Sequence, residues 1–204
     1  NHMRHSWRIT AVKALEHGPQ RAALWVRFTG GASRAEFTFY INAGEPVVRV
    51  DARAFWNERT ARLKMVMPVD APSAEFDVPG GIVRRLPAGE VPGGRWVRTR
   101  GAKGDFGLST DTLYGFDLAA GTLRATIVRS SRFADDSVRG PGEVPFQPAT
   151  DQGEHRFKFL LNADGSAIPR LAAELEQPPV SLIVTAHRGK LPRKGAVLDV
   201  RPAR

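Results

Sequence analysis

The chain contains no cysteine, so it can form neither a disulfide bond nor a thiolate metal site. It has no apolar run that approaches the roughly 18 residues of a membrane-spanning helix and no recognisable signal peptide, so we expect no membrane partner. Asn1-His2-Met3 is interpreted as a vector-derived scar and is left out of the fold prediction. The prediction therefore covers residues 4–204 as a single domain without covalent cross-links.

The composition is that of a globular protein with an excess of positive charge. Hydrophobic residues make up 42% and charged residues 25% of the 204 residues, which favours one sizeable core over disorder. The net charge is +9, and clustered Lys and Arg would indicate a nucleic-acid or other polyanion site. Because the arginines are scattered along the chain, the sequence predicts no nucleic-acid partner. A polyanion-binding module is the weakest of the functional alternatives.

Short alternating apolar runs, separated by turn residues, extend along most of the chain. Leu24, Val26 and Phe28 alternate in this way within one run. Helical spacing occurs at Ile168–Leu175, ahead of Pro178-Pro179. The series predicts an all-β fold, a large antiparallel β-sandwich. The predicted strands are Trp7–Leu15, Arg21–Thr29, Arg34–Asn42, Pro46–Phe55, Leu63–Val69, Ala74–Val78, Trp96–Arg100, Phe106–Ser109, Thr122–Arg129, His155–Leu161, Val180–Thr185 and Ala196–Val200. The side chains expected in the core include Trp56, Leu63, Met65 and Phe76.

Two segments lack strand character. They are Leu86–Arg95, which is rich in glycine and proline, and Phe133–Thr150, and both are predicted to be exposed loops. Asp135 and Asp136 lie in the second segment and are interpreted as solvated, because neighbours in sequence point apart and no apolar pocket surrounds them. Loops of this kind often rim an active site in enzymes, and a plain connection is the alternative that stays open.

No set of residues in the sequence forms a recognisable active site. His155 lies in a strand-like run without a second ligand at metal spacing and is interpreted as structural, and His187 as exposed. Ser109 and Ser130 lack the Gly-x-Ser-x-Gly elbow of a nucleophilic serine. The tryptophans could stack on sugar rings, but their alternating strand positions favour packing; they are Trp7, Trp25, Trp56 and Trp96. We therefore predict no catalytic residue and no metal site in this chain.

Four stretches of the chain match, in order, patterns of one glycosidase family. Asp105–Arg132 reads DFGLSTDTLYGFDLAAGTLRATIVRSSR and resembles the segment "G(V/L)xxLxDxxYGxDxxxxxLxLxLxRS" of family-38 glycoside hydrolases, the α-mannosidases. Phe55–Val69 (FWNERTARLKMVMPV) is similar to "DWxExxxxLKVxFPV". Ser73–Arg85 (SAEFDVPGGIVRR) is similar to "AxYExPFGxIxRP", and Asp151–Leu160 (DQGEHRFKFL) to "DxGxHxFxYxL". The shared order indicates that this similarity is not due to chance.

The resemblance implies that the chain is the C-terminal β-sandwich of an α-mannosidase, a supersandwich of the galactose-mutarotase-like type. In that family the Asp nucleophile and the zinc ligands lie on an N-terminal barrel and the domain after it. The resemblance therefore implies a non-catalytic domain with no cofactor of its own, and zinc in the missing catalytic domain. The parent enzyme would carry out retaining hydrolysis of terminal α-mannosidic bonds in mannose-containing oligosaccharides. The domain would pack on the catalytic domain, complete one wall of the active site and support homo-oligomer formation; the alternative is a freestanding carbohydrate-binding sandwich.

Asp111 and Tyr114, in the turn of the Asp105–Arg132 segment, are the candidate substrate-binding residues. The resemblance places this turn at the edge of the mannose pocket, where a carboxylate and a phenol can hold sugar hydroxyls. In the structural alternative, Gly115 takes a positive φ, the Tyr114 hydroxyl binds a neighbouring backbone group and Asp111 caps backbone N–H groups. Both interpretations stay open at this point.

Overall fold

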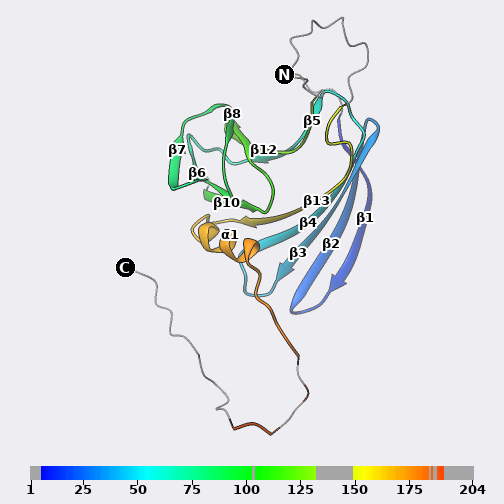
Figure 1. Cartoon of the computed structure of the whole chain (residues 1–204), viewed down its shortest axis with the longest axis vertical. Coiled ribbons are helices and arrows are strands. Elements are labelled where there is room, and N and C mark those ends of the chain that lie inside the picture. Colours follow the sequence, from blue (N-terminus) through cyan, green and yellow to red (C-terminus); the bar gives the residue numbers. More distant parts are fainter. Residues whose placement is uncertain (1–5, 103, 132–148, 184, 186–187, 191–204) are drawn as a thin grey trace, which may run out of the picture.

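The computed structural model describes residues 6–102, 104–131, 149–183, 185 and 188–190, which form two antiparallel β-sheets packed face to face (Figure 1). The nine-stranded sheet has the order β1-β2-β3-β4-β13-β10-β9-β6-β7, and the four-stranded sheet has the order β5-β12-β11-β8. The predicted all-β sandwich is thus confirmed. The strands of the larger sheet are β1 (Arg8–His17), β2 (Arg21–Gly30), β3 (Ser33–Asn42), β4 (Val47–Trp56), β13 (Gly153–Asn162), β10 (Gly104–Thr110), β9 (Trp96–Gly101), β6 (Ala74–Val78) and β7 (Gly81–Arg85). Those of the smaller sheet are β5 (Ala61–Pro68), β12 (Thr122–Ser130), β11 (Gly115–Ala119) and β8 (Ala88–Pro92).

Strands β1 to β4 form a meander whose two faces differ in chemistry. Cross-strand partners share a face, and the row of Leu24, Phe39 and Val50 is apolar. The opposite face carries arginines, among them Arg53, whose guanidinium carbon lies 4.5 Å from the centre of the Phe55 ring. One face is therefore built to be covered and the other to meet water, as is common for antiparallel sheets.

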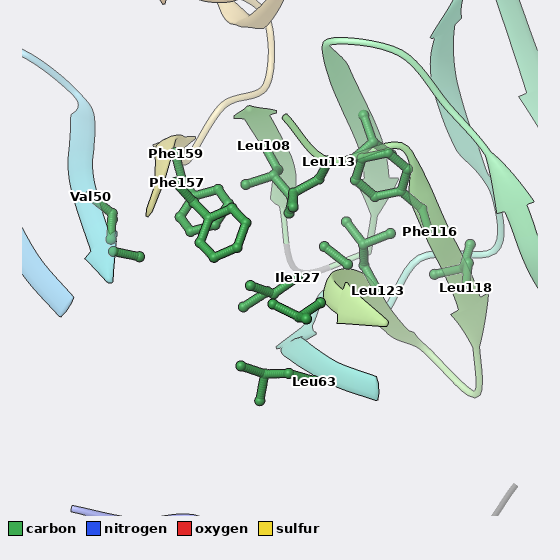
Figure 2. Packing of buried hydrophobic residues seen from close by; sticks show 14 of the residues in the cluster. Val50, Leu63, Leu108, Leu113, Phe116, Leu118, Leu123, Ile127, Phe157 and Phe159 are labelled. Atoms are coloured by element: carbon green, nitrogen blue, oxygen red, sulfur yellow. The ribbon is translucent and has the colours of Figure 1, made fainter. Parts of the chain in front are cut away.

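The main core lies between the two sheets (Figure 2). Leu63, Phe116 and Ile127 of the four-stranded sheet belong to the same buried cluster as Val50 and Phe159 of the nine-stranded sheet, and their side chains point into the space between the sheets. Phe116 and Phe159 are fully buried. The core forms because each strand turns every second side chain to the facing sheet.

The predicted core residues are mostly confirmed. Trp56, Leu63 and Phe76 are buried, and the Phe76 and Phe116 rings lie 6.0 Å apart between their centroids. Met65 is only partly buried, because it lies on β5, the edge strand of the smaller sheet.

One helix, α1 (Ile168–Glu176), is present among the described residues and confirms the predicted helix at Ile168–Leu175. Its Ile168 packs with Leu160, and Leu160 alternates in β13 with Phe159, which points into the main core. The helix therefore covers the other face of the nine-stranded sheet. Gly107 permits this contact, because a Cβ there would lie 2.9 Å from the Ile168 Cβ. No helix in the described part of the chain is long and apolar enough to cross a membrane.

Strands β7, β8 and β11 lie where the sequence patterns predict none. The predicted loop Leu86–Arg95 is wrong at its centre, where β8 pairs with β11 and Pro92 lies opposite Gly115. β8 tolerates its glycine and proline because it is an edge strand, so only one of its sides needs hydrogen-bond partners. Composition alone does not reveal this pairing.

The predicted strand Val180–Thr185 is also wrong. Residues 180–183 and 185 have no regular structure, and the Val180 side chain is 99% exposed. The period-two pattern is present in the sequence, but no neighbouring strand pairs with it among the described residues. Some predictions concern residues that the structure does not describe. They are the strand Ala196–Val200, the aspartates Asp135 and Asp136, His187, the scar residues 1–3 and nearly all of the loop Phe133–Thr150.

Candidate functional site

The outer face of the four-stranded sheet carries a group of charged side chains. In β5, Leu63 turns into the core, so Arg62 and Lys64 turn outward. In β11, Phe116 turns inward and Asp117 outward, beside its cross-strand partner on β12. We call the set the charged cluster; it consists of Arg62, Lys64, Glu90, Asp117 and Arg124.

The charged cluster is a continuous chain of ion pairs. Lys64 contacts a carboxylate oxygen of Asp117 through its Nζ, and the same Nζ lies 3.0 Å from Glu90 Oε2. Arg62 contacts Glu90 from the other side. Arg124 Nε lies 2.5 Å from Asp117 Oδ1, as an ion pair without the alignment of a hydrogen bond. Positive and negative groups thus alternate along this chain of ion pairs, which joins residues from all four strands, and each group restricts the rotamers of its neighbours.

Glu90 is held in its ionised form by this arrangement. Burial raises the pKa of Glu90, but the hydrogen bond from Lys64 and the charges of Lys64 and Arg62 outweigh that effect, so the pKa lies below its ordinary value of 4.5. A general acid in glycoside hydrolysis needs a raised pKa. Glu90 is therefore unsuited to protonating a leaving group.

Acidification is expected to destabilise the domain through Glu90. A carboxyl group with a lower pKa in the folded than in the unfolded state stabilises the fold above the unfolded pKa, near 4.5, and this contribution is lost as the pH falls through the folded pKa. We expect the difference in melting midpoint between the wild type and Glu90→Gln to be larger at about pH 7 than at about pH 3. A difference that is equal at the two pH values would contradict the lowered pKa.

Two hollows lie over this face. The larger, about 1260 Å³, is lined by the charged cluster and its neighbours, and the smaller, about 300 Å³, by Arg62, Glu90, Tyr114 and Arg129 among others. Arg129 lines both hollows and makes no ion pair within the described part of the chain. Arg62, Lys64, Arg124 and Arg129 line the hollows together with the carboxylates of Glu58, Glu90 and Asp117. The hollows therefore carry one more positive than negative charge, and the Arg129 guanidinium offers free donors.

Tyr114 lies at the rim of the smaller hollow. Its backbone is fixed, because its carbonyl oxygen accepts a 2.9 Å hydrogen bond from the Gly93 N–H. Its side chain is 65% exposed, and its hydroxyl has no hydrogen-bond partner among the described residues. The expectation that this hydroxyl binds a neighbouring backbone group is therefore wrong. The positive φ expected at Gly115 is wrong too; a Cβ at Gly115 would lie 2.9 Å from Glu90 Oε1, so a larger residue there would displace the Glu90 carboxylate.

Asp111 is placed differently and does not line either hollow. Its Oδ1 accepts hydrogen bonds from the Lys158 backbone N–H and the Thr112 hydroxyl, both at 3.1 Å. The β10–β13 ladder ends at Thr110 and Phe159, so this carboxylate continues the pairing by one residue. Asp111 thus caps a backbone N–H, as the structural interpretation expects, and the structure does not bring Asp111 and Tyr114 into one site.

Among the remaining candidates, His155 and Ser130 have local partners. His155 Nε2 lies 2.8 Å from the Asp151 carbonyl oxygen, and Ser130 donates to the Thr150 carbonyl at 2.9 Å. Trp56 and Trp96 are 2% exposed and offer no platform for a sugar. The described residues contain no group of three or more His, Cys, Asp or Glu that could hold a metal ion, so they do not fit the zinc site that the family resemblance implies for the catalytic domain.

Sequence reasoning missed the charged cluster and Arg129. The signal that could have found it is a charged residue at each outward position of otherwise apolar strands, as with Asp117 between Phe116 and Leu118. Asp117 and Arg129 also occupy the Asp of "YGxD" and the Arg of "RS" in the family pattern. The pairing of β5, β12, β11 and β8 was needed to show that these residues share one face.

Comparison with known proteins gives one family match. A model of the C-terminal domain of glycosyl hydrolases family 38 matches residues 2–137. An α-mannosidase from Enterococcus faecalis V583 superimposes with a TM-score of 0.72 at 14% identity, covering 92% of this chain and 26% of that chain. A protein in glycosyl hydrolase family 38 from Enterococcus faecalis gives 0.71 at 15% identity, covering 92% and 27%. No curated protein matches the chain significantly.

These matches differ in what they support. At such low identity the two solved structures show a shared fold, and the chain spans about a quarter of their length. The family match rests on sequence and covers three of the four blocks, while the block at Asp151–Leu160 follows the matched residues.

Proposed function

Because the chain belongs to glycosyl hydrolase family 38, whose C-terminal domain it matches, we propose that it is the non-catalytic C-terminal domain of a retaining α-mannosidase. In this proposal the parent enzyme hydrolyses terminal α-mannosidic bonds of mannose-containing oligosaccharides. The domain packs on the catalytic domain and completes one wall of its active site. The fold shared with the α-mannosidase from Enterococcus faecalis supports this placement.

The chemistry of the charged cluster supports a non-catalytic role. Retaining hydrolysis uses two carboxyl groups, one protonated as the acid and one free to attack the sugar. Glu90 and Asp117 are the carboxylates of the charged cluster, and both contact Lys64. Asp117 is further enclosed by Arg124, and its side chain is only 9% exposed. Neither carboxylate is therefore available as an acid or as a nucleophile.

One observation supports the proposal that the domain completes a wall of the active site: Tyr114 and Arg129 both line the smaller hollow. Both side chains have unused hydrogen-bond donors, and both lie beside the rigid charged cluster. Sugar hydroxyls are bound by groups of this kind, held in place by neighbours that cannot move. We propose that Tyr114 contacts substrate in the parent enzyme. Asp111 stays a predicted substrate contact, but its hydrogen bond to Lys158 favours a structural role.

The parent enzyme allows the two roles to be separated. Tyr114→Phe removes a hydroxyl without a partner, so we expect an unchanged melting midpoint and a loss of about threefold to tenfold in kcat/KM, the value of one neutral hydrogen bond. Asp111→Ala removes the acceptor of Lys158, so we expect a loss of about 1 kcal/mol in stability with unchanged kinetics of the folded enzyme.

A separate measurement on the chain of residues 1–204 alone tests the non-catalytic role. This chain should not hydrolyse a chromogenic α-mannoside with or without added zinc. Turnover that persists on repurification would refute the non-catalytic role. A Tyr114→Phe enzyme with normal kcat/KM would remove Tyr114 from the site. Binding of free mannose oligosaccharide to the chain alone, lost in Tyr114→Phe, would favour the freestanding carbohydrate-binding module instead.

A further inference from the structure

The apolar face of β1, β2 and β3 is not covered by the second sheet. Along one cross-strand row the exposed fraction rises from 0% at Phe159 and 3% at Val50, through a half-buried Phe39, to 41% at Leu24. Ala14 of β1 pairs with Leu24 and is exposed. Figure 1 shows the same arrangement: β1 to β3 extend away from the four-stranded sheet. The face that forms the core at β13 and β4 therefore continues into solvent.

Neighbouring rows on this face also have exposed members. On the row of Phe37, Val26 and Val12, Val26 is buried at 5% exposed, but Val12 of β1 is 58% exposed. Ile41 of β3 is 53% exposed. We call this surface the open face; it consists of Val12, Leu24, Phe37, Phe39 and Ile41. A contiguous apolar patch of this kind on a soluble domain marks an interaction surface.

In the four-stranded sheet, the edge strand on the side of the open face is β5. It follows β4 after the short turn 57–60, and its Leu63 packs in the same cluster as Val50. One side of β5 pairs with β12, and its other side has no strand partner among the described residues. An unpaired row of N–H and C=O groups is a template for a further strand.

We propose that β-strands of the same polypeptide, from outside residues 1–204, pair with β5, extend the four-stranded sheet and cover the open face. Strands lie about 4.8 Å apart, so about three added strands would cover β1, β2 and β3. The inference rests on the proposed function, because it requires a longer protein. The two solved structures are such proteins, since this chain spans 26% and 27% of them.

A second copy of this chain fits the open face poorly. The four-stranded sheet packs on the nine-stranded sheet and stands about 10 Å above the plane of the open face. The sheet of a second copy would therefore contact the four-stranded sheet before it reached the open face. Pairing through the edge of β1 is hindered by its two bulges, between Ile9 and Ala11 and between Ala14 and Glu16. Strands attached to β5 fill the step without collision.

The test compares the full-length protein with the chain of residues 1–204. The double variant Val12→Glu with Leu24→Glu places two charges on the open face, and Ile82→Glu is the matched control, since Ile82 on β7 is 57% exposed. In the chain of 1–204 we expect both variants to shift the melting midpoint by less than about 2 °C, because the side chains are already in water. In the full-length protein the double variant should lower it by about 10 °C, and the control should not.

Amide hydrogen exchange of β5 supplies a second measurement that does not depend on catalysis. The β5 amides should exchange at least about 100-fold more slowly in the full-length protein than in the chain of 1–204. Equal exchange of the β5 amides in both proteins would overturn the strand pairing. It would be overturned as well if the double variant lowered the melting midpoint of the full-length protein but the β5 amides were not protected there. Self-association of the 1–204 chain that the double variant abolishes would assign the face to a second copy. If these measurements hold but the full-length protein has no mannosidase activity, the proposed function fails and the strand pairing stands.

Discussion

Leu63→Ala is expected to lower the free energy of unfolding by about 2–5 kcal/mol, the range for a buried leucine. Leu63 is 9% exposed and is the inward side chain of β5 between Arg62 and Lys64 (Figure 2). Removing it leaves a cavity between the sheets that the rigid neighbours cannot fill. Urea unfolding followed by the fluorescence of the buried tryptophans measures the loss.

Val66→Ala on the same strand is the matched control. Val66 is 58% exposed on the outer face, so we expect its truncation to change stability by no more than about 0.5 kcal/mol. A mild effect of Leu63→Ala together with a loss of stability in Val66→Ala would show that the inward and outward positions of β5 are interchanged. The charged cluster would then lose its geometric basis, because Arg62 and Lys64 would face the core.

Asp117→Ala is expected to cost about 3 kcal/mol, at the lower end of the values for breaking a buried ion pair. The substitution leaves Lys64 and Arg124 without their shared carboxylate in a place where Asp117 is only 6% exposed. The loss stays at the lower end because Lys64 keeps Glu90 as a partner. Thermal and urea unfolding of the 1–204 chain both report it.

Asp105→Ala supplies the comparison for an exposed pair. Asp105 Oδ2 lies 3.9 Å from Arg100 Nε, with side chains 39% and 66% exposed, so its loss should cost about 0–1 kcal/mol. If Asp117→Ala were as mild as this, the cluster would be a solvated set of surface charges. It would then not be a rigid support for Tyr114 and Arg129.

The larger part of the fold could be predicted from local pattern. β2, β4 and β12 are rich in apolar and β-branched residues over nine or ten residues, so their predicted bounds differ from the observed ones by at most one residue at each end. β8 could not be found in this way, because its partner β11 supplies the hydrogen bonds that its own composition does not indicate. Val180–Thr185 shows the opposite failure, since a strand pattern forms no strand without a neighbour to pair with.

Of the side chains at the hollows, only Tyr114 was predicted from the sequence as a substrate-binding residue. Tyr114 was identified from the turn that holds it, and its place beside the smaller hollow keeps it a candidate. Asp111 was identified with it, but a turn of a few residues can point two side chains to different neighbours, and Lys158 is the neighbour of Asp111. The charged cluster joins residues from four strands, and only their pairing shows that they meet.

The position of β13 in the nine-stranded sheet sets the order in which this domain can assemble during synthesis. β1 to β4 pair with their neighbours in sequence, but the side of β4 away from β3 waits for β13, and the Arg53–Glu154 ion pair joins residues 101 positions apart. At roughly 5–20 residues per second, the ribosome takes about 5–20 s to make the intervening segment. During that interval a complete meander presents an unpaired edge and an uncovered apolar face to other nascent chains. Chaperone binding to residues 1–56 would protect the chain at that stage.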